Sequence, residues 1–352
     1  MPAFSPQHPA DGRKWKIGIV GAGNISTFHL QAWRNCARAE VVAIADPSRA
    51  RAAQQAAAFG VDVCYESTAQ MLAAEQLDAL DILSPRETHA EMVHAAIAAH
   101  LPVLCQKPLT NELHSSLELV REAEGSVRLM VNENSRFRPH YRQIGKWIAD
   151  GRLGEIRQVH DLAIASGFLS SDDVTSPPEI RRQPFFRTEQ RMLVAEAMIH
   201  HIDTLRSLLG PLTLAYAAAG RISEWVTGED MASLVFETAG GAPVFLAGNR
   251  SAIGMPETPA EEMLIIGTRA TIRLRDYTVE LLGPSPETVS FNRLDSIQAG
   301  FDHAAGHFIA CLESGTTFDT APTDNLETLA LVEQIYQRLG PLAPGRRTEP
   351  TS

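Results

Sequence analysis

The stretch Lys16–Ser26, K-I-G-I-V-G-A-G-N-I-S, decides the fold of the first half of the chain. A short β-rich run leads directly into two closely spaced glycines, and helical apolar spacing follows them. Glycines let the backbone turn tightly and approach a pyrophosphate, while the start of a helix supplies free N–H groups and a positive dipole end. The segment therefore predicts a strand, a phosphate-binding turn and a helix. The cofactor-binding residues predicted in it are Gly21, Gly23, Asn24 and Ile25.

Asp46 ends the next apolar run, 20 residues after Ser26. An acidic residue at this distance accepts hydrogen bonds from an adenosine ribose diol and repels a 2′-phosphate, so NAD is favoured over NADP. Arg49 and Arg51 lie close enough to weaken that preference. Two simpler interpretations stay open: the glycines form a plain turn between strand and helix, and Asp46 caps a helix.

Short apolar runs and helical patterns alternate on both sides of the glycine turn. Apolar runs recur at Val41–Ala45, Leu80–Leu83, Pro102–Cys105 and Val127–Val131. Strands that alternate with helices predict a doubly wound parallel sheet. We expect a flexible tail over residues 1–13 and a Rossmann dinucleotide-binding domain over residues 14–135.

The alternation of strands and helices ends in the second half, where residues 136–325 are expected to form a second, substrate-binding domain. Met192–Leu209 has a helical pattern that ends at Gly210-Pro211, and 166–187 is expected to be a long loop. Strand-like runs without helices between them fill 212–282, which predicts a mostly antiparallel sheet. A closing helix over residues 326–340 is expected to pack back toward the first domain.

Composition narrows the classes of partner. The 352 residues carry 31 Lys and Arg against 42 Asp and Glu, a net charge of −11, which disfavours nucleic acid and anionic membranes. The four cysteines lie far apart, and no apolar run is long enough to span a membrane. We therefore expect a cytoplasmic protein with no structural metal.

Two further segments follow predicted strands of the first half, where open α/β sheets bind their ligands. Ser84-Pro85 and His89 begin one of them and are assigned to the cofactor, although His89 is equally well placed to cap a helix. Gln106-Lys107 begins the other, and both residues are likewise assigned to cofactor binding. A lysine beside a cofactor crevice can hydrogen-bond a substrate hydroxyl and stabilise the developing alkoxide, but a surface lysine before a turn has the same sequence.

Glu196 and His200 are four residues apart in the predicted helix, so they share one face, which continues to Asp203. A carboxylate beside a histidine orients the ring and raises its basicity, which suits a general base. A metal site and a buried structural histidine are the alternatives. We assign Lys107, His200 and Glu196 as catalytic. The substrate-binding candidates are Asn134, Arg136, His201 and Asp203.

These motifs in this order resemble the glucose–fructose oxidoreductase, inositol dehydrogenase and MocA-like family of nicotinamide-dependent dehydrogenases. The family pattern of an E-K-P segment, an N-x-R-F stretch and a D-x-x-x-H helix appears here as Q-K-P from Gln106, N-S-R-F from Asn134 and E-A-M-I-H from Glu196. The segment Gln183–Arg187 resembles a subgroup that includes D-apiose dehydrogenases. Gln106 and Glu196 depart from the family's Glu and Asp, which puts the substrate in doubt more than the chemistry.

The resemblance implies NAD-dependent oxidation of a sugar or polyol hydroxyl, in an aldose such as apiose or in inositol. It implies Lys107 and His200 as the catalytic pair, with the identity of the proton acceptor open between them. It also implies that the sheet of residues 136–325 is large and open and that this domain serves oligomerisation as well as substrate binding. The expected assembly is a homo-oligomer, a dimer or tetramer. The alternatives are a glycosidase that retains its NAD and a non-catalytic NAD-binding sensor.

Overall fold

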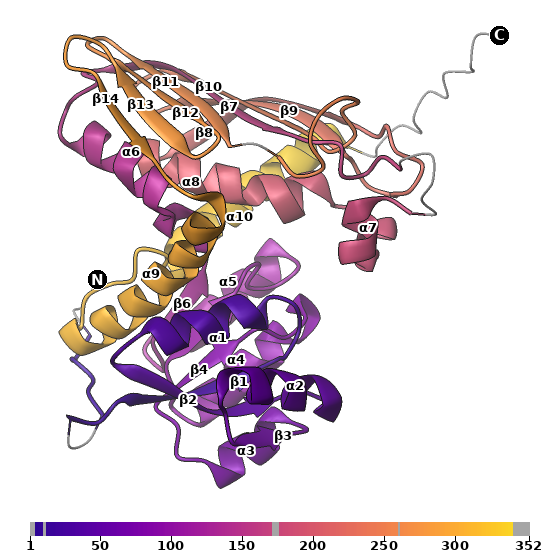
Figure 1. The fold of residues 1–352 in the computed structure, drawn as a ribbon, viewed down its shortest axis with the longest axis vertical. Helices are drawn as coiled ribbons and strands as arrows, with labels where there is room; N and C mark the ends of the chain where they lie inside the picture. Colours follow the sequence, from indigo (N-terminus) through magenta and orange to yellow (C-terminus); the bar gives the residue numbers. More distant parts are fainter. Residues whose placement is uncertain (1–3, 10–11, 171–175, 260, 341–352) are drawn as a thin grey trace. The chain divides into compact units, whose positions relative to one another are not determined.

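The computed structural model describes residues 4–9, 12–170, 176–259 and 261–340, which form two compact units (Figure 1). The first unit comprises the chain up to Arg138 together with Leu294–Glu327; the second comprises Pro139–Arg293 and the residues from Thr328 onward. The first boundary lies three residues beyond the expected one. The second differs more, because residues 294–325 were expected in the substrate-binding domain.

The first unit is built on a six-stranded parallel sheet with strand order β3-β2-β1-β4-β5-β6. This order confirms the Rossmann prediction. Its strands are β1 (Trp15–Val20), β2 (Ala39–Ala45), β3 (Val63–Tyr65), β4 (Ala79–Ile82), β5 (Val103–Gln106) and β6 (Leu129–Asn132). The sequence pattern did not predict β3, which has only three residues, all half-buried.

Helices connect these strands, and their ends follow local sequence signals. Ser48 caps α2 by accepting a hydrogen bond from the Arg51 N–H, and Gly60 ends that helix with a φ of 73°. The helices are α1 (Ser26–Asn35), α2 (Arg49–Phe59), α3 (Thr68–Ala74), α4 (His89–Ala98) and α5 (Leu113–Ala123). Short 3₁₀ turns lie at Arg86–Thr88 and Asn134–Phe137.

Helix α9 (Arg293–Ser314) belongs to the first unit because its apolar side chains complete that core. Phe308 is fully buried, and its ring meets Trp33 of α1 edge-on with 6.3 Å between centroids. Phe301 stacks on Phe28 at 5.2 Å. Burial of several aromatic faces against α1 therefore outweighs the nearness of α9 in sequence to the second unit.

Part of the segment expected to be a flexible tail packs against the first unit. The Phe4 ring lies 4.4 Å from the guanidinium carbon of Arg128, and the Gln7 N–H donates to the Leu312 carbonyl at 2.9 Å. Residues 1–3 and 10–11 of that segment lie outside the described residues.

The second unit is built on an eight-stranded sheet with order β14-β13-β12-β11-β7-β10-β9-β8. All neighbouring strands are antiparallel except β7 and β10, which run parallel, so the predicted mostly antiparallel sheet is confirmed. Its strands are β7 (Ile156–Ile164), β8 (Leu212–Gly220), β9 (Met231–Thr238), β10 (Pro243–Asn249), β11 (Glu262–Gly267), β12 (Thr271–Arg275), β13 (Thr278–Leu282) and β14 (Glu287–Ser290).

Helices α6 (Pro139–Ala149) and α8 (Ile199–Leu209) cover one face of this sheet (Figure 1). A π-helical segment, Leu193–Met198, leads into α8, so the helix expected from Met192 is present with a widened first part. Helix α10 (Pro322–Leu339) begins in the first unit and ends in the second. The closing helix expected over 326–340 is thus the later part of α10.

The segment expected to be one long loop, residues 166–187, contains regular turns. Helix α7 (Pro178–Arg182) and a 3₁₀ turn at Pro184–Arg187 lie in it, while residues 171–175 lie outside the described residues. Proline at the first helical position starts α7 because the missing N–H of that residue has no helical partner in any case.

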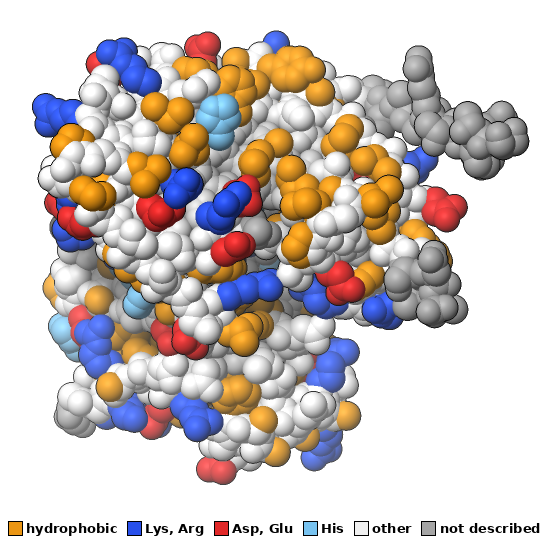
Figure 2. Space-filling model, turned by 45° about the horizontal axis from the view of Figure 1, so that its top comes forward, with side chains coloured by type: hydrophobic (Ala, Val, Ile, Leu, Met, Phe, Trp, Pro, Cys, Tyr) orange, Lys and Arg blue, Asp and Glu red, His pale blue; other side chains and the backbone are white. Residues whose placement is uncertain are grey.

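The sheet face opposite α6 and α8 has no helix of the described chain against it (Figure 1). With the top of that view turned forward, Figure 2 shows hydrophobic side chains over this sheet. Tyr216 is 53% exposed, and Leu162 and Phe245 are each more than one-third exposed. The His160 ring stacks on Phe245 at 5.0 Å. We call the surface formed by these four residues the outer face.

Within the described chain, no helix is both long enough and apolar enough to cross a membrane.

Candidate functional site

The glycine turn lies against the end of β4. Gly21 has a φ of +103°, and a Cβ there would come within 2.7 Å of the Ser84 backbone nitrogen. The Gly21 N–H donates to the Ala45 carbonyl at 2.8 Å, which ties the turn to the end of β2. Only glycine fits this position, because both the backbone conformation and the space exclude a side chain.

Gly23 differs, since a Cβ built on it would meet nothing within 4 Å. The protein itself therefore does not require a glycine there, and open space lies beside the backbone at the start of α1. No side chain caps α1, and its first turn contains no acidic residue. Buried Ser26 stands in the third glycine position and donates to the Gly23 carbonyl at 2.6 Å. Open space beside uncapped helix N–H groups fits a pyrophosphate.

Asp46 is buried at the end of β2 and holds the turn in place. Its Oδ2 accepts from the Ala22 N–H at 2.8 Å, and its Oδ1 accepts from the Ser48 N–H at 2.7 Å. Arg51 also donates to Oδ1 at 3.0 Å while its side chain stays 59% exposed. Ser48, not Asp46, caps α2. The carboxylate thus positions the glycine turn, and its negative charge lies where an adenosine ribose would approach.

His89 joins the two loops that follow β4 and β5. Its Nδ1 lies 2.8 Å from the Pro108 carbonyl and its Nε2 lies 2.9 Å from the Ser84 carbonyl, and the ring is buried. Burial lowers the pKa of His89, although both carbonyls favour the protonated ring. The ring therefore holds the Ser84-Pro85 loop and the loop that contains Pro108 together. The Lys107–Pro108 peptide bond in the second loop is cis.

Gln106, the last residue of β5, belongs to a buried polar network centred on His29. Its Nε2 lies 3.0 Å from His29 Nε2, and Asn132 Nδ2 lies 2.9 Å from the same ring nitrogen. His29 Nδ1 lies 2.8 Å from Asp81 Oδ2, which also accepts from Trp33 Nε1 at 2.7 Å. An amide at Gln106 suits this network, because it donates to a ring nitrogen that accepts.

Lys107 follows Gln106 directly and is partly exposed at the carboxyl end of β5. Its backbone N–H donates to Gln106 Oε1 at 2.9 Å, so the buried network also shapes the backbone that carries the lysine. Arg136, predicted to contact substrate, donates to Asp324 Oδ2 at 2.7 Å and to the Asp319 carbonyl at 2.9 Å. Asn134 is buried on the same 3₁₀ turn.

The π-helical segment of the second unit carries Glu196, and His200 follows in the first turn of α8. Two side chains from distant parts of the sequence hold its start. Buried Glu229 accepts from the Val194 N–H at 3.1 Å, and the Tyr336 hydroxyl accepts from the Ala195 N–H at 3.2 Å. Such widened turns are frequent at functional sites. Glu196 and His200 therefore share this helix, but not with ordinary α-helical spacing throughout.

His201 forms a pair with Asp161 of β7. Its Nδ1 lies 2.9 Å from Asp161 Oδ2, and the carboxylate is buried while 14% of the histidine side chain is exposed. Burial alone would lower the pKa of His201, but the charge and hydrogen bond of Asp161, with Glu261 nearby, outweigh it and raise the pKa. A partly accessible ring that favours its protonated form can donate a hydrogen bond to a ligand oxygen.

Asp203, the last substrate candidate, is fully buried. Its Oδ1 accepts from the Thr328 hydroxyl at 3.0 Å, and Thr328 in turn accepts from Arg206 Nη1 at 2.8 Å. This chain of hydrogen bonds links α8 to α10 within the second unit.

Two family models match the chain in succession. The model described as "Oxidoreductase family, NAD-binding Rossmann fold" matches residues 15–133, and that of the GFO/IDH/MocA C-terminal domain matches residues 141–273. D-apiose dehydrogenase of Paraburkholderia graminis is 33% identical over 342 residues, which covers 92% of this chain and 87% of that protein. The chain belongs to the GFO/IDH/MocA oxidoreductase family.

Other members of the family extend the comparison over both units. Inositol 2-dehydrogenase of Rhizobium meliloti is 28% identical and covers 90% of this chain and 94% of its own. An oxidoreductase from Agrobacterium radiobacter, solved with NAD⁺, L-tartaric acid and magnesium, superposes with a TM-score of 0.84 at 25% identity, covering 92% of this chain and 96% of its own. The predicted family, fold and NAD-binding class are confirmed.

The cofactor of the family fits the residues present in the first unit. The open space at Gly23, the uncapped start of α1 and the carboxylate of Asp46 provide what a dinucleotide needs. Among the described residues, no group of three or more His, Cys, Asp or Glu is placed to hold a metal ion.

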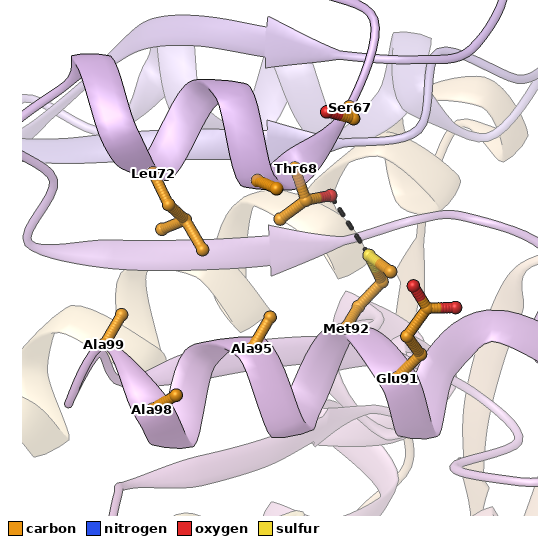
Figure 3. A pocket seen from close by; sticks show the side chains of 9 residues that line it. Ser67, Thr68, Leu72, Glu91, Met92, Ala95, Ala98 and Ala99 are labelled. Atoms are coloured by element: carbon orange, nitrogen blue, oxygen red, sulfur yellow. Dashed lines mark hydrogen bonds between the residues drawn. The ribbon is translucent and has the colours of Figure 1, made fainter.

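A cavity of about 420 Å³ opens between α3 and α4 on the first unit (Figure 3). Its lining is mostly small and apolar, with Thr68 donating to Met92 Sδ at 3.0 Å and Glu91 at one end. None of the predicted site residues lines this cavity. It is therefore separate from the glycine turn.

Sequence patterns missed three groups of polar residues that surround the predicted site residues: His29 with Asp81, Asp161, and Glu229 with Tyr336. One signal was available for Asp161. The buried residues of β7 alternate as Val159, Asp161 and Ala163, so a carboxylate interrupts an apolar strand face. A charged residue in such a position needs a partner.

Proposed function

We propose that this family member oxidises a hydroxyl group of a sugar or polyol, with NAD as the acceptor. The observation that carries the proposal is the similarity to D-apiose dehydrogenase, 33% identical across both units of the chain. Inositol 2-dehydrogenase, matched over 90% of the chain, also acts on a hydroxyl-rich ring. D-apiose and myo-inositol are therefore the first compounds to test.

The chain's own residues have complementary tasks in this proposal. NAD, when bound, accepts the hydride from the oxidised carbon. His200 takes the proton of the reacting hydroxyl, and Lys107 donates a hydrogen bond to that oxygen and stabilises its negative charge. Glu196 orients His200 or binds a neighbouring hydroxyl. His201 donates to a second hydroxyl, because Asp161 favours its protonated ring.

The test is NADH formation by Lys107→Met and His200→Ala with D-apiose and myo-inositol. We expect each change to lower kcat by about 10²–10⁴-fold. Lys146→Met and His94→Ala are matched controls, because both side chains lie more than half exposed on other helices. Near-wild-type turnover in both site variants contradicts the mechanism. A lower pH limit of kcat that disappears in His200→Ala identifies His200 as the proton acceptor.

The same assays separate the two alternatives. An NAD-retaining glycosidase releases an aglycone without net NADH. A sensor binds NAD saturably and reduces none of it across a panel of aldoses and polyols. Comparing NAD with NADP tests Asp46: a preference for NADP contradicts its assigned role.

We propose that the outer face of the eight-stranded sheet joins copies of this chain into a dimer or tetramer. Its support is the exposure of Tyr216, Leu162 and Phe245 on a face without a covering helix in the described chain. Phe245→Glu introduces a charge there and is expected to lower the mass measured by light scattering to that of one chain. An unchanged mass assigns the assembly to another surface.

We propose a cytoplasmic location and no nucleic-acid partner. All four cysteines are free, and a net charge of −11 opposes contact with phosphate backbones. Cell fractionation and a gel-shift assay with duplex DNA test the two statements.

A further inference from the structure

Arg250 follows the last residue of β10 and is held by its backbone on both sides. Its N–H donates to the Asp230 carbonyl at 2.8 Å, and its carbonyl accepts from the Phe168 N–H at 2.9 Å. Val244 and Leu246 are buried on the covered face of the strand. Gly248 faces the π-helical segment, since a Cβ there would lie 2.6 Å from Met198 Sδ.

Side chains of a strand alternate between its two faces, so every second residue points to the same side. Arg250 comes two residues after Gly248 and therefore lies on the same face. The charge of Arg250 also acts on His201, which supports that placement. Arg250 therefore lies on the side of the sheet that carries the predicted substrate residues of the second unit.

The guanidinium of Arg250 forms no hydrogen bond or ion pair with any residue that the structure describes. The residue is only partly exposed, and burial lowers the pKa of its side chain. A guanidinium has five N–H donors in a fixed fork. No Arg250 nitrogen is among the fully buried side-chain atoms that lack a partner, so the fork faces space open to solvent, where oxygen atoms of a bound ligand can replace water as acceptors.

The charges around Arg250 indicate which ligand. Glu179, Glu261 and Arg182 are charged groups that act on Arg250, so two carboxylates balance two guanidinium groups. The neighbouring His201 and its partner Asp161 add one charge of each sign and leave this balance unchanged. Arg182 forms an ion pair with Glu179, and the Tyr141 hydroxyl donates to Glu261. An anionic ligand would leave this group with an excess negative charge. A neutral ligand with several hydroxyl oxygens leaves the balance unchanged and satisfies the fork.

We propose that Arg250 is a specificity-determining residue that donates hydrogen bonds to hydroxyl oxygens of a neutral sugar or polyol, away from the reacting carbon. The inference rests on the proposed function and narrows its substrate class: neutral polyhydroxy compounds are preferred over sugar acids of the same size.

The test compares Arg250→Met, which removes the fork, with Arg250→Lys, which keeps the charge but not the geometry. Kinetics are measured with D-apiose or myo-inositol, whichever the wild type oxidises. We expect Arg250→Met to raise KM for that compound by about 10–100-fold, as for a lost hydrogen bond to a charged donor. KM for NAD stays within twofold, and Arg250→Lys is intermediate. Arg157→Met is the matched control, because Arg157 is 60% exposed on β7.

The wild type is also compared on D-glucose and D-glucuronate, and we expect a higher kcat/KM for the neutral sugar. An unchanged KM in Arg250→Met overturns the inference, and so does an effect on thermal unfolding alone. A preference for the acid overturns the choice of a neutral ligand. If the wild type reduces NAD with neither test compound nor either hexose, the proposed function fails as well. If the wild type is active and Arg250→Met has the same kcat and KM, only this inference is contradicted.

Discussion

Each unit contains a histidine paired with a buried aspartate, and the two pairs differ at the second ring nitrogen. In the first unit, His29 has Asp81 at Nδ1 and the amides of Gln106 and Asn132 at Nε2. In the second unit, His201 has Asp161 at Nδ1, while Nε2 has no hydrogen-bond partner among the described residues and the side chain is 14% exposed.

This difference at the second ring nitrogen gives the two histidine–aspartate pairs different tasks. At His29 both ring nitrogens have hydrogen-bond partners within the protein, Asp81 at Nδ1 and the two amides at Nε2. At His201 one ring nitrogen is committed and the other remains available to a ligand. We call the first the closed pair and the second the open pair.

The largest effect is expected from breaking the closed pair. Asp81→Ala leaves the Nδ1–H of His29 and the indole N–H of Trp33 buried without an acceptor, at about 1–3 kcal/mol each. We therefore expect the free energy of unfolding to fall by about 2–5 kcal/mol in urea titrations. Asp161→Ala is the matched comparison, and it should cost less because the His201 ring reaches water. Equal losses would mean that the two pairs do not differ in this respect.

An intermediate effect is expected from removing only the charge of the open pair. In the wild type, Asp161 raises the pKa of His201 above its usual value. The pair therefore contributes stability at low pH, which is lost as the pH rises through the pKa of the folded protein. Asp161→Asn removes both effects of Asp161. Burial, the largest single effect, and the charge of Arg250 then lower the pKa of His201 against Glu261, which raises it, so stability should instead be lost as the pH falls.

The measurement is the free energy of unfolding between about pH 5.5 and 8.5, where histidine titrates. We expect the slope of this free energy against pH to change sign between the wild type and Asp161→Asn. Parallel curves for the wild type and Asp161→Asn would show that Asp161 does not control the charge of His201.

Local patterns predicted much of this molecule, and distant contacts account for what they missed. The strand, glycine turn and helix that begin at Lys16 and the helix stop at Gly210 each rest on residues close together in the sequence, so local spacing finds them. Asp46, 20 residues after Ser26, was found from the fixed distance typical of this fold. Neither of the two buried histidine–aspartate pairs could be found from local spacing. Asp81 and His29 are 52 residues apart, and Asp161 and His201 are 40 apart.

Contacts between residues far apart in the sequence also explain why local patterns did not predict the π-helical segment or the extent of the first unit. A pattern from Met192 predicts a helix, but its widened turn also depends on Glu229 and Tyr336, which lie far along the chain and hold its first N–H groups. Likewise α9 follows the second unit in sequence yet belongs to the first, because Phe301 and Phe308 are buried against α1. Such contacts appear only once the chain has folded.

The smallest effect is expected at a third histidine–carboxylate pair, which tests whether burial or distance sets the contribution of such a pair to stability. His94 Nε2 lies 2.6 Å from Glu122 Oε2, a shorter distance than in either buried pair, but both side chains are more than half exposed. Water and salt screen this pair, and holding both side chains costs conformational entropy. We expect Glu122→Gln to change the free energy of unfolding by less than ~0.5 kcal/mol. A loss comparable to that of Asp81→Ala would mean that distance, and not burial, sets the strength of these pairs.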